Sequence, residues 1–587
     1  MKNKLMVSLL MTLTLSIFIS CQPSKNSQIT SNEILSHISY LASDSLKGRY
    51  PGTDESFLAA QYISNQLTEY GLTPFFDNTF QTFDIVTECT LEGENYLIIN
   101  GDSLNIETDF MPLAFSVSGE KKGYVCFAGY GFDLNTDSLT WNDYADLEVD
   151  GKWVLLLRED PEPDNMNSEF IPFAGDRAKV TLAKDKGAIG VLLVNGLNTS
   201  KKDIPVPLSY DQNLSDAGIP VISITRAVAN QLLTSSIEKL ESVMILNKKP
   251  LTEKIEATIE AKVQITHKKA TGRNVVCMIP SFETSDQFIV IGAHYDHLGM
   301  GGSGVSSRMP DTIAVHNGAD DNASGIAGMI EMAGYAKAHQ KKLKKNLLFV
   351  AFDAEEMGLL GSKYFVENWS KDKKITTMLN FDMIGRMKHD TIGISIGGSG
   401  TAAQFDSLIN NQTVSFKITT SPDGYGPSDH APFYSEEIPV LYFSTGAHSD
   451  YHTPFDDVDA IKPDKEELIV KYATELMLNL AVNSDTLTFQ STGGPQKSRR
   501  TRLKVTLGIV PDFSGVIQNG LGIDGVRPDG PADKGGLQKG DIITSINGEE
   551  VTNIYDYMFR LSKLKSGTTA IIEINRSNQK EVKLIQL

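Results

Sequence analysis

Cysteine is scarce in this chain, with only four among 587 residues. So few cysteines exclude a disulfide scaffold, in which closely spaced pairs make up for a small hydrophobic core. Cys89, Cys126 and Cys277 lie far apart, and none has a neighbouring cysteine at the spacing of a metal-binding pair. We therefore expect these three to be buried as small hydrophobic side chains rather than to bind metal.

Positive charge is also in deficit, because 54 Lys and Arg residues oppose 73 Asp and Glu residues and leave a net charge of −19. Together with the lack of a long basic block, this excludes nucleic acid as the main partner. The 41% hydrophobic and 22% charged composition excludes wholesale disorder. Tandem repeats are absent from the sequence, and its length predicts about three or four domains.

Beyond its N-terminus the chain lacks an apolar run of the roughly 18 residues that a membrane-spanning helix needs. The first residues do carry a shorter run, Leu5 to Ser20, which follows Lys2 and Lys4 and ends at Cys21. This pattern resembles a bacterial lipoprotein signal peptide (1–20), cut before a lipidated Cys21; plain secretion is the alternative. We expect the rest of the chain, after a polar linker (21–30), to lie outside the cytoplasm at the bacterial cell envelope.

Two sequence patterns, one near the N-terminus and one in the second half of the chain, predict parts of the same domain. Apolar residues recur at helical spacing between Ser31 and Gly71, which predicts two helices. Strand–helix alternation dominates 274–483, and it is typical of an α/β fold with a mixed, mainly parallel sheet flanked by helices. These segments predict one domain made of residues 31–110 and 256–483.

The remaining segments have a different composition. Short apolar runs between 111 and 255 predict a β-rich inserted module. Residues 484–502 are polar and predict a linker, and residues 503–587 form a strand-rich final domain. Because that linker offers few apolar side chains, we expect the final domain to pack lightly on the rest, so that a truncation after Asn483 keeps its activity.

Histidines and carboxylates gather at the predicted strand ends between residues 294 and 452. Each candidate has an ordinary structural explanation when it is taken alone, such as a solvated loop or a helix cap. Together they are His294 and Asp296 after one strand, Asp320 and Asp321 before a helix, Glu355 and Glu356 after a second strand, Asp382 after a third, and His452 in a later loop. Strand ends of one parallel sheet meet at a common edge, so these side chains are predicted to converge.

Two histidines and three carboxylates suit a pair of Zn²⁺ ions bridged by a shared Asp. Such a pair binds a water molecule jointly and lowers its pKa. One Glu of the Glu355–Glu356 pair would then remain free as the general base for that water. Asp296 lies close enough to His294 to accept its second ring N–H.

The motifs Gly292–Asp296, Gly318–Gly325, Ala354–Glu356, Asn380–Asp382 and His452–Pro454 resemble those of the M28 metallopeptidases, which are di-zinc aminopeptidases. The resemblance implies His294 and Asp382 on one zinc, Glu356 and His452 on the other, and Asp321 as the bridge. It also implies Glu355 as the general base and Asp296 as the residue that orients His294. Tyr425 is implied as the residue that stabilises the oxyanion, and Tyr451 is the alternative for that role.

Two further segments resemble known modules. Gly129–Gly131 and Trp141–Tyr144 are similar to motifs of a protease-associated domain, which would shape access to the site. Leu507–Ile509, Gly530–Ala532 and Gly536–Asp541 resemble a PDZ domain, with Leu507–Ile509 as the turn that binds the carboxylate of peptide C-termini.

These features predict a zinc-dependent exopeptidase, an aminopeptidase, that acts on peptides outside the cytoplasm. A glutaminyl cyclase shares this fold with a single zinc, and a receptor-like module shares it without metal; the complete ligand set argues against both. His297, His316 and His448 lie near the ligands in sequence, but we expect them to be solvated loop residues without a direct role.

Overall fold

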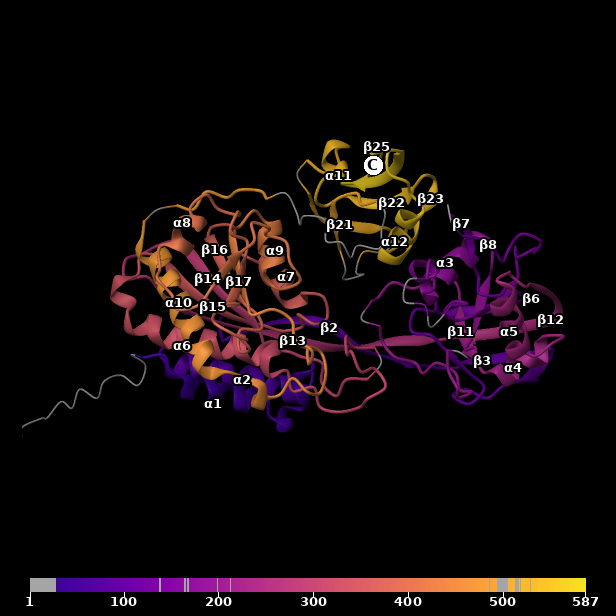
Figure 1. Cartoon of the computed structure of the whole chain (residues 1–587), viewed down its shortest axis with the longest axis horizontal. Coiled ribbons are helices and arrows are strands. Elements are labelled where there is room, and N and C mark those ends of the chain that lie inside the picture. The colour runs from indigo at the N-terminus through magenta and orange to yellow at the C-terminus, as the bar shows by residue number, and fades with distance from the viewer. Residues whose placement is uncertain are drawn as a thin grey trace, which may run out of the picture.

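The computed structural model describes residues 28–587, apart from 137–138, 163–164, 166–167, 198, 212, 303, 485, 493–504, 513–516, 518 and 528. The predicted signal peptide and Cys21 lie outside the described residues. Among the described helices, none has the length and apolar character needed to cross a membrane. Figure 1 shows a first lobe that contains the helices α1, α2, α6 and α10, an inserted lobe, and a C-terminal domain that lies above the gap between them.

The first lobe contains a nine-stranded sheet with the order β1-β13-β15-β14-β16-β19-β17-β18, and β2 pairs with β13. The strands of the central group, β15-β14-β16-β19, are parallel, whereas β13 and β17 join that group in antiparallel fashion. The predicted fold class, a mixed sheet with a parallel core, is confirmed. The strands are β1 (Thr73–Pro74), β2 (Phe80–Leu91), β13 (Ile265–Ile279), β14 (Gln287–His294), β15 (Asn346–Phe352), β16 (Lys374–Phe381), β17 (Ile394–Gly397), β18 (Ile418–Thr420) and β19 (Val440–Ser444).

Helices cover both faces of this sheet because its central strands are apolar on both sides. In β15, Leu347, Phe349 and Ala351 face one core, and the alternate residues Leu348, Val350 and Phe352 face the other. The first core includes α1 (Ser31–Leu41), α2 (Asp54–Glu69), α6 (Gly325–Ala338), α8 (Phe405–Asn410) and α10 (Pro463–Val482); the second includes α7 (Leu360–Glu367) and α9 (His430–Ser435). The two helices predicted between Ser31 and Gly71 are present, and the hydroxyl oxygens of Thr30 and Thr53 cap them.

The inserted module contains a second sheet of eight strands, in the order β4-β3-β12-β6-β9-β10-β11-β5. This sheet takes in strands on either side of the predicted limits at 111 and 255, so the limits of the insert stay a prediction. Its strands are β3 (Tyr96–Ile99), β4 (Asp102–Ser103), β5 (Phe110–Pro112), β6 (Gly119–Phe127), β9 (Trp153–Leu157), β10 (Gly190–Val194), β11 (Val221–Ile224) and β12 (Glu253–Val263). Also present are the pair β7 (Asp133–Asn135) and β8 (Thr140–Asn142) and the helices α3 (Asp176–Asp185), α4 (Arg226–Leu232) and α5 (Ile237–Asn247).

A long ribbon of β2 and β13 joins the two lobes (Figure 1). The pairing runs from Val275–Phe80 in the first sheet to Ile265–Leu91 beside the insert. The three cysteines Cys89, Cys126 and Cys277 are buried and unpaired, as predicted.

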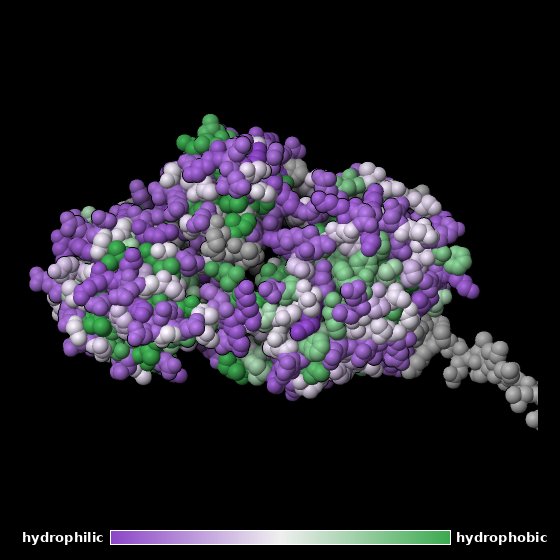
Figure 2. Space-filling model, turned by 180° about the vertical axis from the view of Figure 1, so that it is seen from behind, coloured by the Kyte–Doolittle hydropathy of each residue, from purple (hydrophilic) through white to green (hydrophobic). Residues whose placement is uncertain are grey.

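The C-terminal domain contains a six-stranded sheet and two helices among its described residues. These elements are β20 (Ile509–Pro511), β21 (Leu521–Val526), β22 (Ile542–Ile546), β23 (Glu549–Glu550), β24 (Thr569–Arg576), β25 (Gln579–Gln586), α11 (Pro531–Lys534) and α12 (Ile554–Ser562). Figure 2 shows a mainly hydrophilic surface, with apolar residues prominent at the outer end of this domain. Exposed apolar side chains there include Val582 and Leu584 of β25.

The expectation that the final domain packs lightly is wrong. Arg560 of α12 forms an ion pair with Asp185 of α3, and Lys363 of α7 binds two carboxylates of the C-terminal domain. Part of the predicted linker is also fixed, because Phe489 pairs with Ala402 through a β-bridge. The polar composition of 484–502 therefore did not mean loose packing: side chains elsewhere make the contacts.

Candidate metal centre

The predicted side chains converge at the carboxyl edge of the central parallel strands. His294 ends β14, Glu355 and Glu356 follow β15 closely, and Asp382 follows β16 directly. Asp321 lies in the turn η3 (Ala319–Ser324) that leads into α6, and His452 lies in the loop after β19. Neighbouring parallel strands place their ends at one edge, which explains why sequence-distant residues meet here.

Asp321 lies between the two histidines. Its Oδ1 atom is 3.3 Å from Nε2 of His294, and its Oδ2 atom is 3.3 Å from Nε2 of His452. On the first side, Nε2 of His294 lies 3.6 Å from Oδ1 of Asp382. On the second side, Nε2 of His452 lies 3.1 Å from Oε2 of Glu356.

The donor set fits a pair of metal ions. Two groups of potential ligand atoms, each within 4.8 Å of one another, are His294 with Glu355 and Asp382, and His297 with Asp321 and Glu356. All of these side chains are largely buried. Imidazole nitrogens and carboxylate oxygens are the ligands that zinc takes in catalytic sites.

Excess negative charge dominates the electrostatics of this cluster. Although burial by itself lowers the pKa of His294, the carboxylates of Glu355, Asp321 and Asp382 raise it well above its ordinary value. His452 behaves in the same way: burial lowers its pKa, but Asp321 and Glu356 raise the pKa to about 10. Both shifts show that the pocket favours added positive charge, which metal cations supply.

Asp296 supports the cluster in a way that differs from its predicted contact. The backbone carbonyl of Asp296, 3.2 Å away, contacts Nδ1 of His294, whereas the nearer carboxylate oxygen lies 3.7 Å from that nitrogen. The carboxylate instead accepts the backbone N–H groups of Glu355 and Glu356, at 3.1 and 3.2 Å. Asp296 therefore positions both the histidine and the glutamate pair.

Residues 274–477 match the family described as "Peptidase family M28", and this match spans the whole edge just described. The chain carries an M28 peptidase domain. Residues 117–232 match the PA domain and residues 522–576 match the PDZ domain, which confirms both predicted modules.

The chain is similar to several named proteins. Aminopeptidase YwaD of Bacillus subtilis is 25% identical over 392 residues, which cover 64% of this chain and 76% of that protein. The probable lipoprotein aminopeptidase LpqL of Mycobacterium tuberculosis is 27% identical over 245 residues, 41% of this chain and 38% of that protein. The solved structure of BSAP, a zinc aminopeptidase from Bacillus subtilis, aligns over 77% of this chain and 96% of its own, with 19% identity and a TM-score of 0.48.

Two polar residues of the peptidase domain hold the backbone around Asp321. The Asp456 carboxylate accepts the N–H groups of Asp320 and Asp321, with a shortest distance of 3.0 Å to the latter. The buried Arg49 guanidinium donates to the carbonyls of Leu41, Tyr295, Asn317 and Gly318. The turn that carries the central carboxylate is thus tied to the loop after β14 and to the first helix.

The expectation that His297, His316 and His448 are solvated is wrong, because all three are buried. Nδ1 of His297 lies 2.7 Å from Oε1 of Glu356, and Nε2 of His448 lies 3.3 Å from Oδ2 of Asp320. His297 is part of the site that sequence reasoning did not assign. Its place directly after Asp296 was the available signal.

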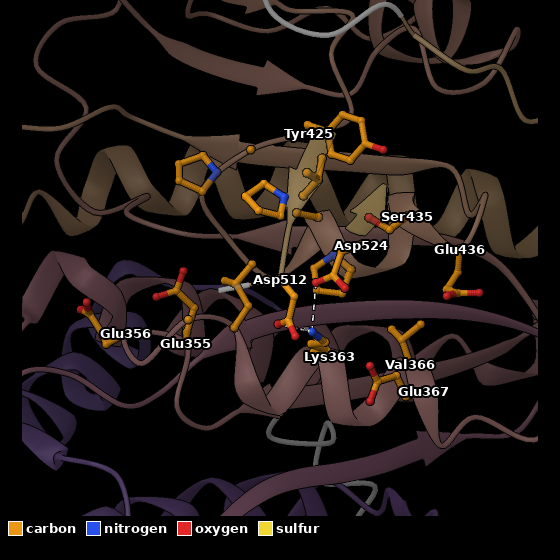
Figure 3. A pocket seen from close by; sticks show the side chains of 18 of the residues that line it. Glu355, Glu356, Lys363, Val366, Glu367, Tyr425, Ser435, Glu436, Asp512 and Asp524 are labelled. Atoms are coloured by element: carbon orange, nitrogen blue, oxygen red, sulfur yellow. Dashed lines mark hydrogen bonds and ion pairs between the residues drawn. The ribbon is translucent and has the colours of Figure 1, made fainter. Parts of the chain in front are cut away.

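Tyr425 and Tyr451 both line a cavity beside the predicted metal ligands, and Tyr451 contacts one of these ligands directly. The Tyr451 ring stacks on His452 with centroids 3.8 Å apart, and its pKa is raised by burial and by Asp321 and Glu356. Tyr425 packs edge-on against Tyr434 at 4.6 Å, and Figure 3 shows its hydroxyl directed away from Glu355 and Glu356. The oxyanion role stays a prediction for Tyr425, with Tyr451 as the alternative.

This cavity, of about 470 Å³, extends from the predicted metal ligands to the PDZ domain. Glu355, Glu356, Tyr451 and His452 are among the residues that line it, and Figure 3 shows the two glutamates at one end. Its outer part is lined from α7 and α9 of the peptidase domain and by Val510, Pro511, Asp512, Asp524 and Lys539 of the PDZ domain.

Proposed function

We propose that the protein is a zinc-dependent aminopeptidase that removes N-terminal residues from peptides outside the cytoplasm with two co-catalytic zinc ions. The observation that carries this proposal is the place of Asp321, 3.3 Å from Nε2 of both His294 and His452. Asp321 would bridge the ions, His294 and Asp382 would hold one, and Glu356 and His452 would hold the other. Two such ions supply a bound water of lowered pKa and a Lewis acid for the peptide carbonyl.

The chain's own residues supply the proton transfer. Burial and the charges of Glu356, Asp429 and Asp382 raise the pKa of Glu355 well above its ordinary value, so this carboxyl is suited to accept a proton. Glu355 would take a proton from the attacking water and return it to the leaving amine. Asp296 holds the backbone of Glu355, and Tyr425, with Tyr451 as the alternative, would donate a hydrogen bond to the oxyanion.

The names of two relatives support the proposals that the protein is attached to a membrane and that it cleaves peptides from the N-terminus. YwaD and LpqL are both named aminopeptidases, which supports action at the N-terminus. LpqL is also named a lipoprotein, which supports the membrane anchor predicted at Cys21. We further propose that peptide C-termini dock at Leu507–Ile509 of the PDZ domain.

The proposal is tested with purified protein and peptides that carry a free or an acetylated N-terminus. We expect shortening from the free N-terminus only, loss of hydrolysis after chelation and recovery with zinc. Metal analysis should give two zinc ions per chain. Shortening from the C-terminus would refute the aminopeptidase assignment, and one zinc with cyclisation of an N-terminal glutamine would favour the glutaminyl cyclase alternative.

A further inference from the structure

The PDZ domain is fixed to the peptidase domain beside the cavity. Nζ of Lys363 on α7 lies 2.8 Å from Oδ1 of Asp512 and 2.9 Å from Oδ2 of Asp524 (Figure 3). Nζ of Lys539 binds the carbonyl oxygen of Ser435 at 3.1 Å and forms an ion pair with Glu436, both at the end of α9. These contacts join β20, β21 and the loop before β22 to the two helices that line the cavity.

A second set of contacts fixes the PDZ domain to the insert. Arg560 of α12 pairs with Asp185 of α3, and the Thr181 hydroxyl donates to Asp556 over 2.9 Å. Arg177 stacks on the Tyr555 ring at 4.3 Å. Phe559 of α12 is buried in the hydrophobic core of the insert. The PDZ domain is therefore held from two sides, and its position over the cavity is defined.

Close approach of β21 to the cavity wall depends on a glycine. A Cβ atom at Gly525 would lie 2.5 Å from the Tyr425 hydroxyl, so a larger residue at this position would force the tyrosine or the strand to shift. Tyr425 and Gly525 thus form a tight seam between the two domains. Val510 on β20, the strand beside β21, and Asp512 just after that strand line the same cavity.

We propose that the PDZ domain forms the outer wall of the substrate cavity and restricts the enzyme to short peptides. This inference rests on the proposed aminopeptidase function and names its substrate class. A substrate whose N-terminus lies at the proposed zinc ligands must extend through the cavity, and there it meets Val510, Pro511 and Asp524. A volume of about 470 Å³ matches a site for a drug-sized ligand, the size of a peptide of a few residues.

The test is a series of unstructured peptides that share one N-terminal sequence and differ in length, from about two to about twenty residues. We expect kcat/KM of the zinc-loaded wild type to fall by at least about tenfold from the shortest to the longest peptide. The double variant Lys363→Glu with Arg560→Glu places like charges against Asp512, Asp524 and Asp185, and it should release the PDZ domain. Small-angle scattering reports the release, and the length dependence should then disappear.

Restored pairing provides the matched rescue. Adding Asp512→Lys, Asp524→Lys and Asp185→Arg to the double variant reverses the charge of each carboxylate that pairs with Lys363 or Arg560 across the domain boundaries, and it should bring back both the compact shape and the length dependence. Lys465→Glu breaks an ion pair of similar length, 2.9 Å to Asp390, within the peptidase domain and should leave the length dependence unchanged.

The outcomes separate the two proposals. If the wild type cleaves the longest peptide as readily as the shortest, the PDZ domain does not restrict peptide length. The same conclusion follows if the released variant keeps the steep dependence of kcat/KM on length. A zinc-loaded wild type that cleaves no peptide of any length refutes the aminopeptidase function instead.

Discussion

Glu355 and Glu356 are neighbours in sequence but have opposite electrostatic environments. Burial and three other carboxylates raise the pKa of Glu355 well above its ordinary value. Burial also acts on Glu356, but contacts with His297 and His452 lower the pKa of Glu356 to about 2. Two carboxyl groups whose pKa values diverge in this way are suited to the separate roles of base and ligand that we propose for them.

From this division we predict that Glu355→Gln keeps both zinc ions while kcat falls by about 10²–10⁴, the usual contribution of general acid–base catalysis. Metal analysis and steady-state kinetics on one preparation test this. Glu356→Gln is the matched control and should lose zinc. If Glu355→Gln lost metal and Glu356→Gln did not, the two roles would be reversed.

Asp321 and His452 differ in how many of the proposed metal positions they would face. Asp321→Asn should lower the occupancy of both positions, because its two oxygens face one histidine each. His452→Ala should mainly weaken one. Zinc titration followed by calorimetry distinguishes the variants, and an equal loss in both would contradict the bridging role.

Lys179 of the insert predicts a pH dependence remote from the metal centre. Its Nζ atom is buried, donates to the carbonyl of Leu157 at 2.7 Å and lies 4.8 Å from the centre of the Phe132 ring. Burial lowers the pKa of Lys179 to about 7, against 10.5 for a free side chain. Between these values the unfolded chain binds the proton and the folded protein does not, so the free energy of unfolding rises with pH.

We predict that Lys179→Met removes this rise, which amounts to at most about 1.4 kcal/mol per pH unit. Urea unfolding of wild type and variant across this pH window, followed by tryptophan fluorescence, measures it, since Trp141 and Trp153 both lie in the core of the insert. Equal slopes in the two proteins would show that Lys179 stays charged when folded.

At the scale of elements, the parallel strand edge was predictable and the surrounding loops were not. The residues after β14, β15 and β16 follow buried, mainly apolar strands, and parallel strands bring such ends together. The burial of His316 and His448 depends on how loops between distant strands pack, which no local pattern encodes. The insert sheet similarly pairs β3 with β12 across more than a hundred residues of chain, so its limits did not follow from local composition.

The turn that holds Arg49 gives a prediction at this scale. Arg49→Lys keeps a positive charge but loses the planar fork that reaches four backbone carbonyls. Each unpaired buried carbonyl costs about 1–3 kcal/mol, so we expect a clearly lower Tm and weaker zinc binding. Differential scanning calorimetry with and without zinc measures both. Lys47→Arg, on the same turn but exposed, is the control, and equal effects in the two variants would contradict the role of Arg49.

At the scale of the whole molecule, the domains contact one another through side chains far apart in sequence. The polar composition of residues 484–502 indicated a linker but carried no information about Arg560, Asp185 or Lys363. Part of that segment is also structural, because the backbone N–H of Thr492 donates to the Tyr434 hydroxyl over 2.8 Å. These contacts could be found only once the surfaces were assembled.

We therefore predict different outcomes for two truncations. A chain that ends after Thr492 keeps the contacts of Phe489 and Thr492 with the peptidase domain, whereas one that ends after Asn483 loses them. The longer form should melt at the higher temperature, by about 2–4 °C for each kcal/mol that these contacts contribute. Thermal unfolding of both forms tests this, and identical Tm values would show that the segment adds no stability.

The three domains touch pairwise. The ribbon of β2 and β13 joins the peptidase domain to the insert, and the PDZ domain contacts each of them. Each domain therefore contacts both of the others, and this restricts rotation of the domains more than a single hinge between two domains would. A change in the relative position of two domains must break one of these sets of contacts. The contacts of the PDZ domain include ion pairs, which dissolved salt weakens. Ionic strength would thus act on this enzyme as a control of its rigidity.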